Sequence, residues 1–172
     1  MGDLKVNEIK TDTIKDQTGT TAMTIDSGGR VNMPKIPCCM ARLTTSNAQD
    51  TSNPYTTTAT DIRFDSILLN QGNCYSESTG RFVAPVAGIY AAECQFLANN
   101  SASTNLQFTI MKNGTDSLHH GYNSVDTQYV ELHAHVLVEL AASDYISVRL
   151  NQGELYIDAN GRYTSFTVRL VG

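Results

Sequence analysis

The sequence predicts an all-β fold, a sandwich of strands around one hydrophobic core, with an extended N-terminal arm in front of it. Two observations carry this prediction. Apolar and polar residues alternate with a period of two in many short segments, and turn-forming residues separate these segments at short intervals. Helical periodicity is missing almost everywhere. The 172 residues, 41% of them hydrophobic, provide enough material for one domain of ordinary size and a short appendage.

The first 35 residues differ from the rest of the chain in composition. Thr, Asp, Lys and Gly dominate there, and the apolar residues occur singly, at Leu4, Val6, Ile9 and Ile14. A segment with so few apolar residues cannot bury a core of its own. A brief strand, turn and strand are predicted over residues 23–31. We therefore expect residues 1–35 to be an extended anchoring arm ordered by neighbouring chains, and residues 36–172 to be the folded domain.

The alternation of apolar and polar residues alone predicts three strands of the domain. In residues 106–110 the apolar side chains share one face, and Asn113-Gly114 directly afterwards supplies the positive φ angles that a tight hairpin turn requires. Residues 146–150 and 166–170 repeat the alternation. These segments predict strands that each bury one face against a single core.

The longest predicted strand has two different faces. One face carries only apolar residues, namely Val130, Leu132, Ala134, Val136, Val138 and Leu140. The other face carries Glu131, His133, His135, Leu137 and Glu139. A strand with one fully apolar face is typical of a sandwich or barrel with a single packed interior.

Two stretches rich in Thr, Ser, Asn and Tyr are predicted as exposed loops, residues 47–58 and residues 119–127. Such loops suit polar recognition of sugars or proteins, and they serve equally well to keep the surface hydrated. His119 and His120 are interpreted as part of a solvated loop rather than as ligands.

Composition argues against several classes of protein. The net charge of -5, with no run of Lys or Arg, removes the electrostatic attraction on which nucleic-acid binding depends. The N-terminus lacks the apolar stretch of a signal peptide, and no segment approaches the roughly 18 apolar residues of a membrane span, so we expect no membrane insertion. No nucleophile elbow is visible among the many Ser and Thr residues, and we expect no enzyme.

The four cysteines, Cys38, Cys39, Cys74 and Cys94, fit neither a disulfide framework nor a metal site, because two are adjacent and no Cys-x-x-Cys occurs. Cys94 shares the alternation of Tyr90 and Phe96. It is therefore interpreted as a small apolar residue of the core.

From Phe64 onward, the spacing of aromatic, Asn and Gly residues follows a specific order: Phe64, Asn70, Tyr75, Phe82, Gly88 and Tyr90. This pattern resembles the globular head of complement component 1q, a relative of the tumour necrosis factor fold, and the similarity extends from residue 36 to the end. It departs at Ala92 and Cys94, where the family has aromatic residues, and no collagen repeat precedes it. The resemblance implies a ten-strand jelly-roll sandwich that assembles as a homotrimer, with those six residues as its signature.

The resemblance also implies that the strand from residue 130 to 140 lies in the sheet that faces the trimer axis. His133, His135 and Leu137, together with Ile89, are then expected at the subunit interface. Three copies of one His around an axis could bind a metal or an anion, or could repel one another as the pH falls toward about 6. A plain packed interface is the simpler interpretation, and we expect no metal and no cofactor.

The arm carries a second, shorter resemblance. Residues 4–9 and 19–26 are similar to the opening of many tailed-bacteriophage virion proteins. Taken with the knob, this implies a virion structural protein assembled in the host cytoplasm, a trimeric short fibre or capsid decoration. Leu4, Val6, Ile9 and Ile14 would dock to other virion proteins, and the exposed knob could bind a glycan or a protein of the host surface.

Two alternatives come from other classes of protein. One is a soluble cytokine-like or lectin-like binding module. The other is a virion-associated glycan-degrading enzyme, which would need a carboxylate pair in a groove, for which the sequence has no motif.

Overall fold

A computed structural model describes residues 11–46, 55–56, 59–99, 105–123 and 129–172. The chain divides into two units, Met1–Ile36 and Pro37–Gly172. Each unit is described by itself.

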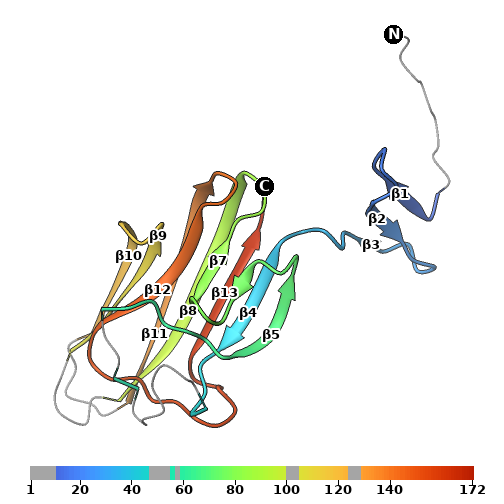
Figure 1. Ribbon diagram of the computed structural model, residues 1–172. Helices are drawn as coiled ribbons and strands as arrows, with labels where there is room; N and C mark the ends of the chain where they lie inside the picture. The colour runs from blue at the N-terminus through green and yellow to red at the C-terminus, as the bar shows by residue number, and fades with distance from the viewer. Residues whose placement is uncertain (1–10, 47–54, 57–58, 100–104, 124–128) are drawn as a thin grey trace. The chain divides into compact units, whose positions relative to one another are not determined.

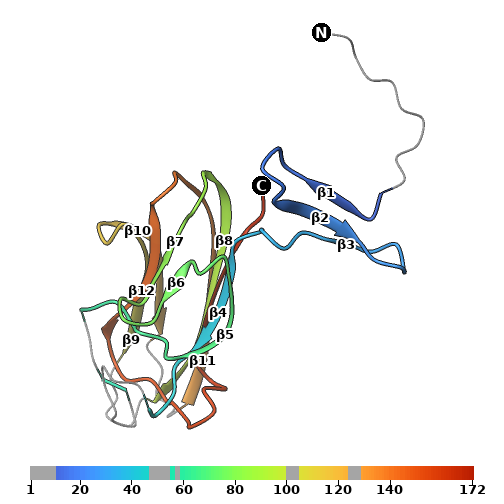
Figure 2. The ribbon, with the colours of Figure 1, turned by 45° about the vertical axis from the view of Figure 1, so that its right-hand side comes forward.

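The larger unit is a sandwich of two five-stranded antiparallel sheets, which Figure 1 and Figure 2 show as two facing layers. The first sheet has the order β11-β8-β13-β4-β5, with bounds Tyr129–Leu140, Gly88–Asn99, Ser165–Leu170, Cys38–Arg42 and Ser66–Gln71. The second sheet has the order β10-β9-β12-β7-β6, with bounds Asp116–Asn123, Leu106–Lys112, Tyr145–Gln152, Arg81–Val83 and Tyr75–Ser76. The predicted all-β, jelly-roll-like sandwich is therefore confirmed.

One hydrophobic core fills the space between the sheets. The alternation predicted from the sequence decides which side chains enter it: Ile146, Val148 and Leu150 of β12 are fully buried. The ring of Phe64 stacks on that of Phe166 at 5.5 Å, and both are fully buried. Cys94 is only 4% exposed, which confirms it as a core residue.

The hairpin between β9 and β10 turns at Asn113 and Gly114, whose φ angles are 53° and 71°. This confirms the turn predicted from the Asn-Gly pair. The prediction of a loop at His119 and His120 is wrong, because both residues belong to strand β10. Neither face of the strand is a run of apolar residues, and a bulge after Ser117 shifts the register, so the sequence shows no alternation.

The smaller unit contains a three-stranded antiparallel sheet, formed by β1 (Thr13–Lys15), β2 (Thr21–Ile25) and β3 (Val31–Asn32). The strand, turn and strand predicted over residues 23–31 are present. The first strand is not predicted, and the described part of the arm is folded into a sheet rather than extended. Among the expected docking residues, Leu4, Val6 and Ile9 lie outside the described residues, and Ile14 lies on β1 with 41% exposure.

In the described part of the chain, no helix has the length and apolar character needed to cross a membrane.

Candidate functional site

The sheet formed by β11, β8, β13, β4 and β5 has one face in the core and one face turned away from it, which we call the free face. On β11 the division is strict, because Leu132, Ala134 and Leu140 are buried. The residues that alternate with the core-facing positions are exposed: Glu131, His133, His135, Leu137 and Glu139. The free face is therefore built by the same alternation that builds the core.

The four residues expected at the trimer interface all lie on the free face. His133 and His135 of β11 pair with Gln95 and Glu93 of β8. Leu137 is 71% exposed. Ile89 is opposite Glu139 and is 47% exposed. The structure brings the four residues onto one surface, with Leu137 and Ile89 at one end of it.

The centre of the free face is polar. A shallow hollow of about 300 Å³ lies there, lined among others by Glu93, Gln95, His133, His135, Ser165 and Thr167. Nε2 of His133 lies 3.5 Å from a carboxylate oxygen of Glu131, and Arg169 lies 3.6 Å from Glu93. Within the described ranges, no three His, Cys, Asp or Glu side chains group as metal ligands. A single copy of the chain thus offers imidazoles and carboxylates here, but no complete ligand set.

Three tyrosines cluster at the other end of the free face, where sequence reasoning predicted nothing. The ring of Tyr156 makes edge contacts with Tyr129 at 5.5 Å and with Tyr163 at 5.2 Å. Together with Leu97 these rings line a hollow of about 310 Å³. Tyr129 remains 51% exposed and Tyr163 37%. Exposed, rigid aromatic rings of this kind are typical of protein interfaces.

The signature residues join the two sheets instead of lining a cleft. The hydroxyl of Tyr75 donates to the carbonyl oxygen of Phe64 at 3.1 Å and accepts from its N–H at 2.9 Å. Burial raises the pKa of Tyr75, which keeps the hydroxyl protonated as a donor. Phe82 and Tyr90 are fully buried and meet edge to face at 5.7 Å. A Cβ added to Gly88 would lie 2.7 Å from the carbonyl oxygen of Gly172, which explains the absence of a side chain there.

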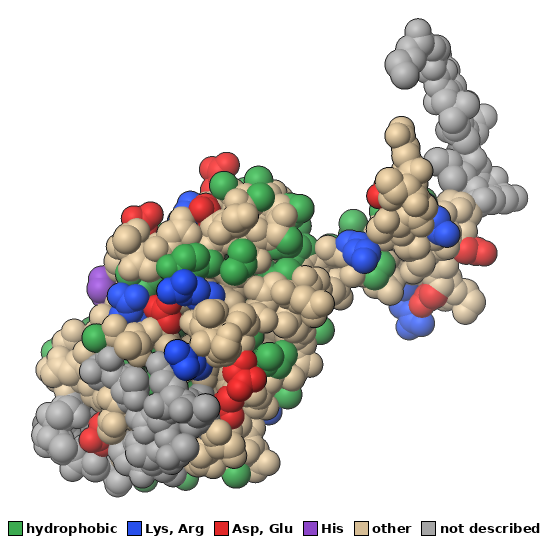
Figure 3. Space-filling view, in the orientation of Figure 1, with side chains coloured by type: hydrophobic (Ala, Val, Ile, Leu, Met, Phe, Trp, Pro, Cys, Tyr) green, Lys and Arg blue, Asp and Glu red, His purple; other side chains and the backbone are tan. Residues whose placement is uncertain are grey.

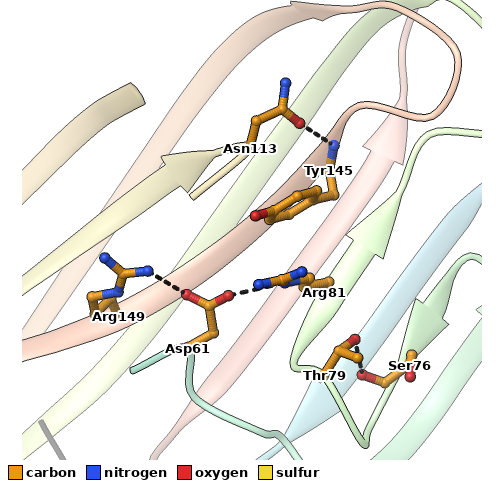
Figure 4. Close-up of polar contacts among 7 residues, drawn as sticks. All are labelled: Asp61, Ser76, Thr79, Arg81, Asn113, Tyr145 and Arg149. Carbon is orange, nitrogen blue, oxygen red and sulfur yellow. Dashed lines mark hydrogen bonds and ion pairs between the residues drawn. The ribbon is translucent and has the colours of Figure 1, made fainter. Parts of the chain in front are cut away.

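The outward face of the second sheet carries a cluster of ionic side chains, drawn in Figure 4. Asp61, whose side chain is 7% exposed, accepts from Nε of Arg81 at 3.1 Å and from Nη2 of Arg149 at 3.0 Å. Figure 3 shows several basic side chains gathered over β12 and β7 around an acidic one. The sequence separates Asp61 from Arg149 by 88 positions, so no local pattern predicts this cluster.

Comparison with known proteins identifies the family of the domain. The model of the C1q domain matches residues 45–171. The chain belongs to the C1q domain family.

Two curated relatives of this C1q chain are animal proteins. Over 97 residues it is 32% identical to complement C1q and tumor necrosis factor-related protein 9 of Mus musculus, and 29% identical to protein 9A of Homo sapiens. Each match covers 55% of this chain and 27% of the relative, so the match spans about a quarter of the relatives' length.

Solved structures show the same fold. The globular domain of zebrafish complement 1qA superposes with a TM-score of 0.60 at 14% identity, covering 79% of this chain and 98% of that chain. Eiger TNF from S. frugiperda gives 0.63 at 10% identity, with 80% and 94% covered. Murine APRIL gives 0.56 at 14% identity, with 80% and 100% covered.

The expectation of a virion protein is wrong, because the relatives are C1q and tumour necrosis factor-related proteins of mouse and human, not virion components. The physical reason lies in the arm. Asp16 accepts hydrogen bonds from the N–H groups of Thr18 and Thr20, and Asp26 accepts from those of Gly28 and Arg30. Thr20 and Asp26, which belong to the segment 19–26 that suggested a phage arm, therefore serve ordinary tight turns, and residues 4–9 lie outside the described residues.

Proposed function

We propose that the chain is a homotrimeric, cytokine-like binding module in which the free face forms the contact between subunits. The observation that carries this proposal is the distribution of exposed apolar side chains on that face. Leu137 and Ile89 occupy one end, and Tyr129, Tyr156 and Tyr163 occupy the other. Large apolar side chains in water are unfavourable, and burying them against a second copy removes that cost.

Threefold symmetry suits this surface. A closed ring of three subunits buries three identical patches and leaves no free copy of the patch exposed. Tyrosine is one of the residue types that commonly dominate the energy of an interface. The tyrosine cluster supplies such residues, and its rings already pack against one another before any partner binds.

The polar centre of the free face needs no ion in this proposal. Glu131 lies close to His133, and Glu93 lies close to Arg169, so each subunit brings its own opposite charges. Replacing His133 and His135 together with Gln should therefore leave the oligomer intact. Loss of the oligomer in that double variant would show that the imidazoles, or an ion bound by them, hold the subunits together.

Interface variants test the proposal. Leu137→Glu and Tyr129→Glu each place a charge on the free face, where three copies would meet, and both should shift the mass in solution from trimer to monomer. Val83→Glu is the matched control, because Val83 is 40% exposed on β7 of the other sheet. A mass that is unchanged in all three variants would contradict an interface on the free face. A monomer in all three variants would show a general effect of added charge.

Residues 1–35 form an appendage in this proposal, and residues 36–172 form the trimerising domain. The proposal is supported by the division of the chain next to Ile36. A chain shortened to residues 36–172 should therefore keep the oligomeric state of the full chain, as measured by light scattering.

A further inference from the structure

A second hollow, of about 280 Å³, lies on the outward side of the second sheet, away from the free face. Residues 59–62 form one wall, because they run beside β12, with the N–H of Ile62 donating to the carbonyl oxygen of Val148 at 2.7 Å. The turn between β6 and β7 forms the other wall. The lining residues are Thr60, Asp61, Arg63, Ser78, Thr79 and Arg81.

Arg81 is held rigidly at the floor of this hollow. Its Nε donates to Asp61 at 3.1 Å, and its guanidinium carbon lies 4.2 Å from the centre of the Tyr145 ring (Figure 4). Asp61 also binds Arg149, so one carboxylate faces two guanidinium groups, and this trio has a net charge of +1. Arg63 also lines the hollow and is exposed.

The guanidinium of Arg81 has N–H groups that can bind a ligand. Of its five N–H groups, only the one on Nε donates to a residue in the described part of the chain. The side chain is 40% exposed, so its terminal N–H groups are accessible from the hollow. A planar guanidinium offers two parallel N–H groups. This geometry matches two oxygen atoms of an oxyanion such as a carboxylate or a phosphate.

The opposite wall presents hydroxyl groups at fixed positions. In the turn, the hydroxyl of Ser78 lies 3.0 Å from that of Ser76, and the hydroxyl of Thr79 donates to the carbonyl oxygen of Ser76 at 3.4 Å. Gly80 has a φ of 70°, and a Cβ there would overlap the carbonyl oxygen of Ile62. The turn therefore packs directly against the first wall, which holds Ser78 and Thr79 near Arg81.

We propose that this hollow is an oxyanion-binding site, which takes a carboxylate, sulfate or phosphate group through Arg81 with help from the hydroxyl of Ser78, which can donate to the anion while it accepts from Ser76. The net positive charge selects an anion, and the fixed guanidinium selects a planar or tetrahedral oxyanion over chloride. The site lies on the sheet that the proposed trimer leaves uncovered. It does not depend on the trimer, because all its residues come from one copy of the chain.

Titration of the full chain with sodium sulfate, sodium phosphate and sodium acetate at constant ionic strength tests the proposal. Amide and Arg Nε signals are followed by NMR, with sodium chloride as the reference. At least one of the three anions should give saturable shifts at Thr79, Gly80 and the Nε of Arg81. The anion that binds most tightly identifies the ligand group, and competition by an Asp- and Glu-rich peptide would identify it as an acidic side chain of a protein.

Arg81→Gln should weaken that binding by about tenfold or more, since it removes a charge-assisted pair of hydrogen bonds. Arg162→Gln is the matched control: Arg162 also donates to an aspartate, Asp158, at 2.8 Å and lies 5.9 Å from a tyrosine ring, but it lines no part of the hollow. Ser78→Ala provides a second test that leaves the ionic cluster in place, with weaker binding expected. Shifts that never saturate, or that both Arg variants reduce equally, would overturn the proposal.

Discussion

Asn70 and Tyr75 hold each other through two reciprocal hydrogen bonds. Nδ2 of Asn70 donates to the carbonyl oxygen of Tyr75 at 2.9 Å, and the N–H of Tyr75 donates to Oδ1 of Asn70 at 3.0 Å. Asn70 belongs to β5 in one sheet and Tyr75 to β6 in the other. The amide therefore replaces a backbone partner at the point where the chain passes between the two sheets.

Asn70→Ala should lower the free energy of unfolding by about 1–3 kcal/mol, because it leaves the N–H and the carbonyl oxygen of Tyr75 without partners. Urea denaturation followed by fluorescence measures the loss. Asn160→Ala, at an exposed position, is the control and should change stability by less than about 0.5 kcal/mol. Equal free energies of unfolding in the two variants would show that the reciprocal hydrogen bonds do not contribute to stability.

Gly121 of β10 lies opposite Phe108 of β9, and a Cβ on Gly121 would overlap the Phe108 ring. Gly121→Ala should therefore destabilise the fold by about 1–3 kcal/mol, since the ring must move within a packed core. Phe108→Leu shortens the obstructing side chain. The double variant should lose less than the sum of the two single losses, and strict additivity would argue against the overlap.

Asp144 joins two turns. Its carboxylate accepts from Nδ2 of Asn113 and from the N–H of Ala141, both at 2.9 Å, and lies 3.0 Å from Nζ of Lys112. These partners, with the Asn113 amide first, lower the pKa of Asp144 to about 2. A carboxyl with a lowered pKa adds stability above its unfolded pKa of about 3.9, and this contribution is lost as the pH falls toward 2.

Asp144→Asn should therefore lose less stability than the natural chain between about pH 4 and pH 2, in urea denaturation repeated at each pH. Asp116→Asn, at an exposed position of β10, is the control. If Asp144→Asn and the natural chain have parallel profiles in this range, the carboxylate is not the source of the acid sensitivity.

Burial also predicts the reactivity of two cysteines. Cys39 is fully buried, and burial raises its pKa to about 12; burial raises the pKa of Cys94 as well. Since the thiolate is the reactive form, a maleimide should modify neither residue until the domain unfolds. Mass spectrometry of protein labelled with and without urea measures this. Rapid native labelling of Cys94 would contradict its place in the core.

The sequence predicts those parts of the fold whose signal is local. Alternation predicts β11, β12 and β13, because each buries one face, and Asn113-Gly114 predicts its turn through positive φ angles. Strand β10 is not predicted from the sequence because neither of its faces is apolar.

The candidate sites are harder to predict, because they depend on which strands become neighbours. The tyrosine cluster combines the start of β11 with residues between β12 and β13. The cluster of Asp61, Arg81 and Arg149 joins three segments that only the folded sheet brings together. The phage resemblance misled because it rested on two short segments, and in the segment that the structure describes Thr20 and Asp26 serve tight turns.

The central claim, that the free face joins three copies of the chain, is tested most directly by the mass of the full chain in solution. Sedimentation equilibrium over a wide range of concentrations should give about 56 kDa, three times the 18.7 kDa of one chain. The Leu137→Glu variant should sediment at 18.7 kDa under the same conditions. A natural chain that sediments as an 18.7 kDa monomer at every concentration would contradict the account.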